Sequence, residues 1–226
     1  MFENVLQRLP HFLMFYPVLL FSLSFHESAH GWMANRKGDP TAKSLGRITL
    51  NPIPHIDIVG TVILPIFIIL GNMPLFGWGK PVPVNPRYFK DIRMDSLWVA
   101  ASGPISNIIL ALIFALILKI EFWILPHLDP TSFMAGSFTR TIVGVVYHMC
   151  EMGVILNLAL AVFNMIPIFP LDGGTVLRGL LPFNSLPLYD RIASFGMPIL
   201  LFLLITGLLR YIFIPVMTVA DLLLPG

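Results

Sequence analysis

The chain has 226 residues, of which 56% are hydrophobic and only 12% are charged, and its mean hydropathy is +0.83. Soluble globular domains carry about 25% charged residues, so this composition excludes an ordinary soluble domain and indicates an integral membrane protein with several spans. The net charge of +2 gives no reason to expect a nucleic-acid partner, and the single cysteine, Cys150, cannot form an internal disulfide and is read as a small apolar residue in a span.

The first apolar run, from about residue 12 to 33, follows a short amphipathic lead-in and predicts a retained first transmembrane helix. It is too long for the core of a cleaved signal and lacks a convincing cleavage site of small residues. It contains His26-Glu27-Ser28-Ala29-His30. Residues four apart on a helix share a face, so both imidazoles can reach one metal ion with Glu27 beside it, as in zinc hydrolases. The alternative is three paired or capped residues at a helix end, but ionisable groups in a membrane segment usually mark a functional site.

Two basic loops flank an ambiguous apolar segment at residues 56–76. The first loop, residues 35–54, ends in a β-branched stretch at 47–50 that predicts a short strand before Asn51-Pro52. The second carries Lys80, Arg87, Lys90 and Arg93. Because Lys and Arg concentrate in cytoplasmic loops, a single crossing at 56–76 would place one of these loops on the wrong side. We therefore favour a re-entrant segment that enters and leaves on the same side.

Two further spans are expected at residues 96–118 and 141–163, joined by an outward-facing loop at 119–140. Small residues around Gly103 allow close helix packing in the first of these spans. For Asn107, on the same face, packing and support of the metal site are both open. His148, near the outer end of the second span, is read as a packed or interfacial histidine rather than a ligand.

A helix break with a carboxylate follows at residues 164–174. Pro167 and Pro170 stop the preceding helix, and the glycines after Asp172 let the backbone approach a neighbour closely. Two histidines need a third protein ligand to build an open catalytic zinc site, and Asp172 fits that need. Its alternative role is an N-cap for a helix at 175–181. His55 and Asp57 are weaker competitors for the third ligand. A last span is expected at residues 192–213.

Together these elements predict an all-α polytopic membrane protein, a bundle of about four to six transmembrane segments with a short membrane-associated β-hairpin or re-entrant element. We expect one domain over residues 1–226, with its core at about 12–182.

Three motifs in this order resemble the site-2 protease family of intramembrane zinc metalloproteases (peptidase family M50). They are His26-Glu27-Ser-Ala-His30, Gly103-Pro104-Ile-Ser-Asn107, and Asn164-x-x-Pro167-x-x-Pro170-Leu-Asp172-Gly173. The resemblance covers about residues 12–182. Gly38-Asp39-Pro40-Thr41-Ala42-Lys43 is similar to the compact bacterial branch, which lacks PDZ and CBS domains.

This resemblance implies that His26, His30 and Asp172 bind one Zn²⁺ per chain. Glu27 would be the general base, and Asn164 would position the substrate backbone or help to stabilise the oxyanion. The implied activity is cleavage of peptide bonds in or near transmembrane segments of membrane protein substrates, the second partner being the lipid bilayer. A substrate held by strand addition at 47–50 or 81–84 would enter laterally past a moving element, with 56–76 and the last span as candidates.

The expected location is the bacterial inner membrane, multi-pass, with the active site toward the cytoplasm because a basic loop follows the metal motif closely. Two other functions stay open: a non-catalytic zinc-binding membrane protein or transporter, and a membrane metalloenzyme acting on a small or lipid substrate. The sequence leaves the oligomeric state open.

Overall fold

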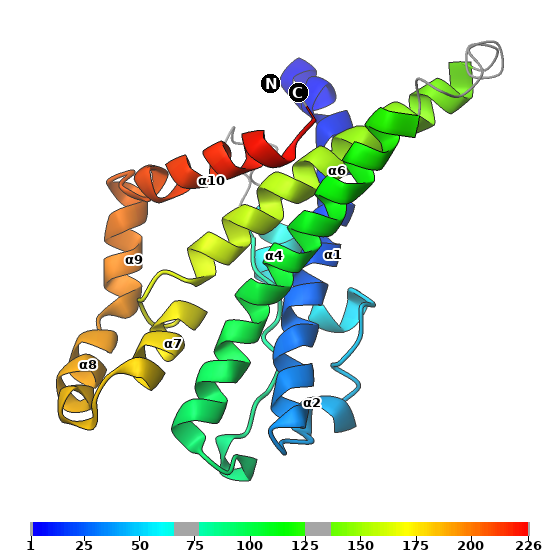
Figure 1. The fold of residues 1–226 in the computed structure, drawn as a ribbon. Coiled ribbons are helices and arrows are strands. Elements are labelled where there is room, and N and C mark those ends of the chain that lie inside the picture. The colour runs from blue at the N-terminus through cyan, green and yellow to red at the C-terminus, as the bar shows by residue number, and fades with distance from the viewer. Residues whose placement is uncertain (1, 66–76, 125–136, 226) are drawn as a thin grey trace.

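The computed structural model describes residues 2–65, 77–124 and 137–225, and within these ranges every regular element is helical (Figure 1). Three helices are long and apolar enough to cross a membrane, over Arg8–Arg36, Ile92–Glu121 and Thr141–Asn164, and a bent pair would make a fourth span. The elements in chain order are α1 (Phe2–Arg36), α2 (Thr41–Ser44), η1 (Ile53–His55), η2 (Ile58–Ile63), η3 (Pro86–Tyr88), α4 (Ile92–Ile124), α6 (Ser137–Asn164), α7 (Asp172–Leu180), η5 (Phe183–Ser185), α8 (Leu186–Ala193), α9 (Gly196–Ile205) and α10 (Leu209–Leu223).

Helix α4 is central, because it packs against α1, α6 and α7. Small residues on its inner face, including Ala111 and Ala115, are buried against Cys150 and Val154 of α6. Alanine at these positions lets two helix backbones approach closely in the membrane. Helix α10 lies across α6 and closes the same cluster (Figure 1). The interpretation of Cys150 as a small apolar core residue is confirmed.

The two basic loops lie at the same end of the bundle. Lys37, just after α1, forms an ion pair of 2.9 Å with Asp95 in the first turn of α4. Asp39 accepts a hydrogen bond of 2.6 Å from the backbone amide of Asn85, and Arg47 donates one of 2.7 Å to the Lys80 carbonyl. The loop that follows α1 and the loop that precedes α4 are thus tied together.

The flanks of the 56–76 segment also meet. A Cβ atom built on Gly77 would lie 2.7 Å from the Gly60 carbonyl oxygen, and Gly60 packs in turn against Trp78. This close approach is the arrangement that a re-entrant segment requires. Residues 66–76, which form most of the predicted excursion, lie outside the described residues.

The strand expected at residues 47–50 is a wrong prediction, since the described residues contain no β-strand. The Thr49 carbonyl, which a strand would offer to a neighbour, accepts hydrogen bonds from Ser28 Oγ at 2.5 Å and from His55 Nε2 at 3.0 Å. Side chains therefore take the place of a ladder, and the segment stays irregular.

The last span expected at residues 192–213 is not one continuous helix. The axis bends by 57° between Phe183–Ala193 and Gly196–Ile205, and a second break separates α9 from α10. At the second break Gly207 adopts a positive φ of 71°, a left-handed conformation that ends helices and that glycine adopts without strain. The Thr206 hydroxyl donates to the Phe202 carbonyl at 2.8 Å, which completes this helix end.

The loop expected at residues 119–140 is shorter than predicted. Helix α4 continues to Ile124 and α6 begins at Ser137, so the described parts of this stretch are helical. Residues 125–136 lie outside the described residues. His148 is exposed and pairs with Glu151 at 3.3 Å.

Candidate active site

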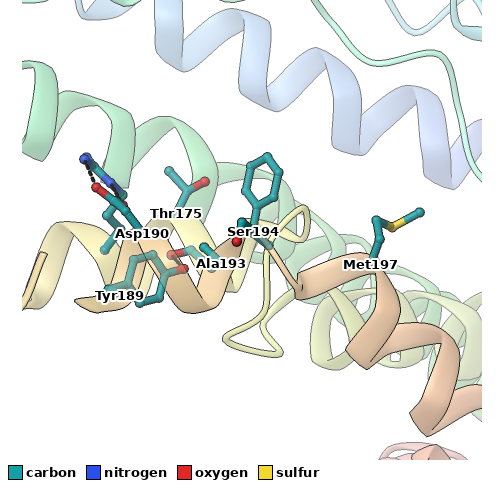
Figure 2. Close-up of a pocket in the computed structure, with 9 residues that line it drawn as sticks. Thr175, Tyr189, Asp190, Ala193, Ser194 and Met197 are labelled. Carbon is teal, nitrogen blue, oxygen red and sulfur yellow. Dashed lines mark hydrogen bonds and ion pairs between the residues drawn. The ribbon is translucent and has the colours of Figure 1, made fainter. Parts of the chain in front are cut away.

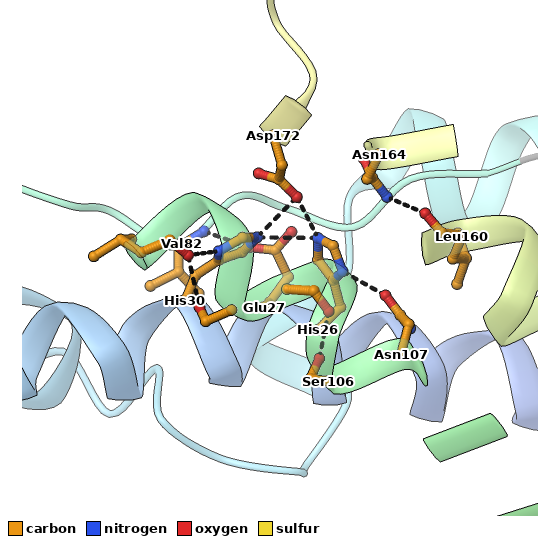
Figure 3. Close-up of polar contacts among 12 residues, drawn as sticks. His26, Glu27, His30, Val82, Ser106, Asn107, Leu160, Asn164 and Asp172 are labelled. Atoms are coloured by element: carbon orange, nitrogen blue, oxygen red, sulfur yellow. Dashed lines mark hydrogen bonds and ion pairs between the residues drawn. The ribbon is translucent and has the colours of Figure 1, made fainter. Parts of the chain in front are cut away.

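Three side chains that could hold a metal ion converge between α1 and the start of α7 (Figure 3). His26 and His30 lie one turn apart on α1, and their Nε2 atoms are 3.0 Å apart. Asp172 Oδ2 lies 3.2 Å from His26 Nε2 and 3.3 Å from His30 Nε2. Within the described residues no other group of three His, Cys, Asp or Glu side chains comes together in this way.

This geometry fits a zinc ion. With Zn–N and Zn–O bonds of about 2.0–2.2 Å, neighbouring ligand atoms of a tetrahedron lie about 3.3–3.6 Å apart. The three separations here are 3.0, 3.2 and 3.3 Å, slightly contracted from those values. Asp172 Oδ2 is buried and accepts no hydrogen bond from the described residues. Burying several lone-pair atoms that face one another without hydrogen-bond donors is costly unless a cation lies between them. This group of atoms therefore fits a metal ion.

Each imidazole is held through its other ring nitrogen. His26 Nδ1 lies 2.6 Å from Asn107 Oδ1, and His30 Nδ1 lies 2.7 Å from the Val99 carbonyl oxygen, both on α4. An oxygen acceptor at Nδ1 keeps the proton on that nitrogen and leaves the Nε2 lone pair for a metal. Of the two roles left open for Asn107, support of the site is therefore the one the geometry favours.

Glu27 lies beside the two histidines, and its carboxylate faces the same side of α1 (Figure 3). Its Oε2 atom accepts a hydrogen bond of 2.7 Å from the backbone amide of Val82. Val82 stands between Pro81 and Pro83, which have no amide hydrogen, so this segment has one amide available at this point and gives it to Glu27. The bond fixes one carboxylate oxygen, and within the described part of the chain no hydrogen bond is made to the other, Oε1.

The helix break places Asp172 at the site. Helix α6 ends at Asn164, and α7 begins with Asp172. The alternative reading of Asp172 as an N-cap is wrong, because Leu171 occupies the cap position and makes no side-chain capping bond. Gly173 packs directly against the Met165 carbonyl, so a larger residue would push α7 away from the histidines. The close backbone approach predicted for this glycine is present.

Gly103 of α4 serves the same packing from the opposite side. A Cβ atom on this residue would lie 2.6 Å from His26 Cε1 and 2.5 Å from His30 Cε1. The helix backbone of α4 therefore forms one wall of the histidine pair. The sequence identified Gly103 as a helix-packing residue, and the structure shows that the surfaces it packs against are the imidazoles.

The other residues named from the sequence use their side chains in local hydrogen bonds. The Asn164 amide turns back to donate a hydrogen bond of 3.0 Å to the Leu160 carbonyl of its own helix (Figure 3). His55 donates to Thr49, and Asp57 caps η2 by accepting from Val59 and Gly60. His55 and Asp57 are thus not brought to the metal-ligating group.

Sequence reasoning missed two residues that touch the site indirectly. Asn157 of α6 accepts a hydrogen bond of 2.8 Å from Asn107 Nδ2, and Val82 holds Glu27. A polar residue in the middle of an apolar span was the available signal for Asn157, since such residues rarely lack a function. The Val82 contact comes from a backbone amide, so no side-chain pattern could reveal it.

A separate groove of about 360 Å³ lies between α7 and α8 (Figure 2). Arg178 and Asp190 form an ion pair of 2.8 Å along it. Tyr189 donates a hydrogen bond of 2.6 Å to the Gly174 carbonyl and so ties α8 to α7. The groove contains none of the three converging ligands, and its polar contacts secure the helix that starts with Asp172.

Comparison with known proteins shows which family carries this arrangement. Residues 14–207 match the profile described as Peptidase family M50. The chain belongs to this family of membrane-embedded zinc metalloproteases, whose members cleave membrane protein substrates. The protein is therefore an integral membrane zinc metalloprotease, and the resemblance to the site-2 proteases is confirmed.

Two relatives support this assignment. The chain is 36% identical over 199 residues, covering 88% of this chain and 83% of the relative, to "Putative zinc metalloprotease YwhC" of Bacillus subtilis (strain 168). It is 30% identical over 155 residues, 68% of this chain and 52% of the relative, to "Putative zinc metalloprotease Rip2" of Mycolicibacterium smegmatis. No solved structure matches the chain significantly.

Proposed function

We propose that this metalloprotease hydrolyses peptide bonds in or near the transmembrane segments of its substrates, with His26, His30 and Asp172 as the ligands of one zinc ion. The observation that carries the proposal is the convergence of His26 Nε2, His30 Nε2 and Asp172 Oδ2 to within 4.8 Å of one another. Such a set leaves one coordination position open, which is typical of catalytic rather than structural zinc sites.

In the proposed reaction Glu27 is the general base. A zinc ion in this site supplies a Lewis acid that lowers the pKa of water and polarises the scissile carbonyl. Glu27 takes a proton from the attacking water while the water oxygen forms a bond to the carbonyl carbon. The same carboxylic acid then gives the proton to the amide nitrogen as the C–N bond breaks, so that an acid and an amine leave. The Val82 amide keeps the carboxylate in place for both transfers.

Asn164 is the proposed contact to the substrate backbone. It stands at the end of α6, eight positions before Asp172, and is half-buried. Its amide has one donor committed to the Leu160 carbonyl, so the second N–H is available for a substrate carbonyl. The extended segment at 81–84 is the better of the two candidates for holding an unwound substrate, because it already crosses the site at Glu27.

The site lies toward the end of the bundle that carries the basic loops. Trp32 and Trp98 mark that end with exposed indoles (47% and 46%), and Trp123, 70% exposed, lies at the other end of α4. Exposed tryptophans gather at membrane interfaces. The midpoint of the His26–His30 turn lies about 6 Å along α1 from Trp32. These features support a site just inside the bilayer on the cytoplasmic side, with the protein in a bacterial inner membrane.

The non-catalytic alternatives are weaker. A transporter would need ligating groups along a path, whereas the one ligating group of the described residues lies at a single depth. A pure binding site would not need a carboxylate held beside the ligands as Glu27 is. The substrate class is tested by offering purified protein in liposomes a single-span substrate and mapping its products by mass spectrometry, and then offering a soluble peptide that carries the mapped cleavage site between polar flanks. We expect cuts within or next to the span. Equal cleavage of the soluble peptide would contradict the proposal.

A further inference from the structure

We propose that Asn157 is a positioning residue. Through Asn107 it determines that the proton of the His26 ring lies on Nδ1 and that Nε2 is left for a metal ion. The inference rests on the proposed role of His26 as a zinc ligand. A chain of hydrogen bonds crosses three helices, from Gly153 and Ser22 through Asn157 and Asn107 to His26. Ser22, Asn107 and Asn157 are fully buried, so a polar group left without its partner here would be costly.

The direction of these hydrogen bonds is fixed by the orientation of the Asn157 side-chain amide. Asn157 Nδ2 lies 2.8 Å from the Gly153 carbonyl oxygen and 2.9 Å from Ser22 Oγ. A backbone carbonyl can only accept, so the Asn157 NH₂ group must point toward it. Its Oδ1 atom then faces α4 and accepts from Asn107 Nδ2 at 2.8 Å.

The same logic passes to the histidine. With its NH₂ group committed to Asn157, Asn107 presents Oδ1 to His26 Nδ1 at 2.6 Å. An oxygen at this distance accepts the Nδ1 proton, which leaves His26 Nε2 with a lone pair directed at Asp172 and His30. The opposite orientation of the Asn107 amide would place an NH₂ group against Nδ1 and move the proton to Nε2, where it blocks metal binding.

The two histidine ligands differ in how much support they need. His30 Nδ1 faces the Val99 carbonyl, which cannot reverse its polarity. His26 Nδ1 faces a side-chain amide, which can turn over and offer either a donor or an acceptor. For His30 the Val99 carbonyl is by itself a fixed acceptor at Nδ1. For His26 the acceptor at Nδ1 is fixed only because Asn157 orients the Asn107 amide.

The test compares zinc affinity with the stability of the metal-free protein for three variants. Asn157→Leu removes the acceptor that orients Asn107. Asn157→Asp keeps an acceptor oxygen toward Asn107 but places a carboxyl group in a buried site, which lowers stability. Ser24→Ala is the matched control, because Ser24 is fully buried on α1 but its hydroxyl bonds only the Leu20 carbonyl of its own helix. Affinity is measured in detergent by competition with a chelator, and stability by thermal unfolding.

We expect Asn157→Leu to weaken zinc binding about 10- to 100-fold, the usual cost of losing a group that orients a ligand. Asn157→Asp and Ser24→Ala should stay within about threefold of wild type, even though Asn157→Asp unfolds at a lower temperature. If Asn157 acted only in packing, affinity would follow stability and Asn157→Asp would bind zinc at least as poorly as Asn157→Leu. That order, or unchanged affinity in Asn157→Leu, overturns the inference.

The outcomes separate this inference from the proposed function. Wild-type protein that binds no stoichiometric zinc contradicts the metal site itself. Tight binding by wild type and by Asn157→Leu contradicts only the role of Asn157. Asn157→Ala, which removes the same acceptor without added bulk, makes the same test if the leucine variant does not fold.

Discussion

Replacing Gly103 with alanine tests how closely α4 confines the two histidines. The added Cβ would lie 2.6 Å from His26 Cε1 and 2.5 Å from His30 Cε1, where ordinary contact begins at 3.4 Å. Both rings must therefore withdraw by about 0.8–0.9 Å, several times the ±0.2 Å tolerance of metal–ligand distances. Overpacking costs about 1–3 kcal/mol, and replacing a helical glycine by alanine returns about 1 kcal/mol. The metal-free protein should lose at most about 2 kcal/mol of stability.

Zinc affinity should suffer more than stability in Gly103→Ala. Two of the three ligands leave their positions, so we expect a loss of at least about 100-fold, equivalent to about 2.8 kcal/mol. Gly144→Ala is the control, because a Cβ there meets nothing within 4 Å and the change gains only helix propensity. Chelator competition gives the affinity of each variant and thermal unfolding gives its stability. Zinc binding by Gly103→Ala within about threefold of wild type would refute the reasoning.

Two further predictions concern the third ligand and a loop anchor. Asp172→Ala should lower zinc affinity by more than about 100-fold, because it removes a ligand rather than its support; retained 1:1 zinc in the purified variant would show that another group is the ligand. The pKa of Asp39 lies below its usual value of 3.8. Burial alone would raise this pKa, but hydrogen bonds from the Thr41 hydroxyl and from the amides of Asn85 and Thr41 together outweigh that effect. The charged form therefore stabilises the fold above pH 3.8, and this contribution disappears as the pH falls through the lowered pKa. Asp39→Asn should lower the free energy of unfolding by about 1–2 kcal/mol at pH 7 and should weaken the fall in unfolding temperature as the pH is lowered. The same fall with pH in wild type and variant would contradict this role.

The three residues proposed as metal ligands stand out in the sequence because their signals are local or chemical. His26 and His30 share a helix face through their spacing of four. Asp172 was proposed as the third ligand because a carboxylate after a double proline break, at membrane depth, needs a cation. Its N-cap alternative could not be dismissed from sequence, since the helix start had to be known to within one residue.

The supporting contacts could not be predicted because they join distant parts of the chain. Asn107 and Asn157 are 50 residues apart, and Glu27 and Val82 are 55 apart. Which polar group meets which depends on how α1, α4 and α6 pack, and hydrophobic patterns leave that open. The sequence left two roles open for Asn107, helix packing and support of the metal site, and its hydrogen-bond partners favour the second.

Two expectations differ from the structure because composition does not report specific contacts or a local backbone conformation. Residues 47–50 have strand-like composition, but Ser28 and His55 occupy the Thr49 carbonyl. Residues 192–213 are mostly apolar, but Gly207 in a left-handed conformation ends the helix. Hydropathy measures whether a segment suits the membrane and does not register a change of backbone direction within it.

The most direct test of the account is cleavage by purified protein in liposomes, with wild type compared with Glu27→Gln, each with and without a zinc chelator. A single-span substrate is offered, and bound zinc is measured in the same preparations. We expect cleavage by wild type alone, its loss with chelator, and a fall of at least about 100-fold in Glu27→Gln with its zinc retained. Equal cleavage by both proteins, or a wild type that cleaves after its zinc has been removed, would contradict a zinc protease in which Glu27 is the base.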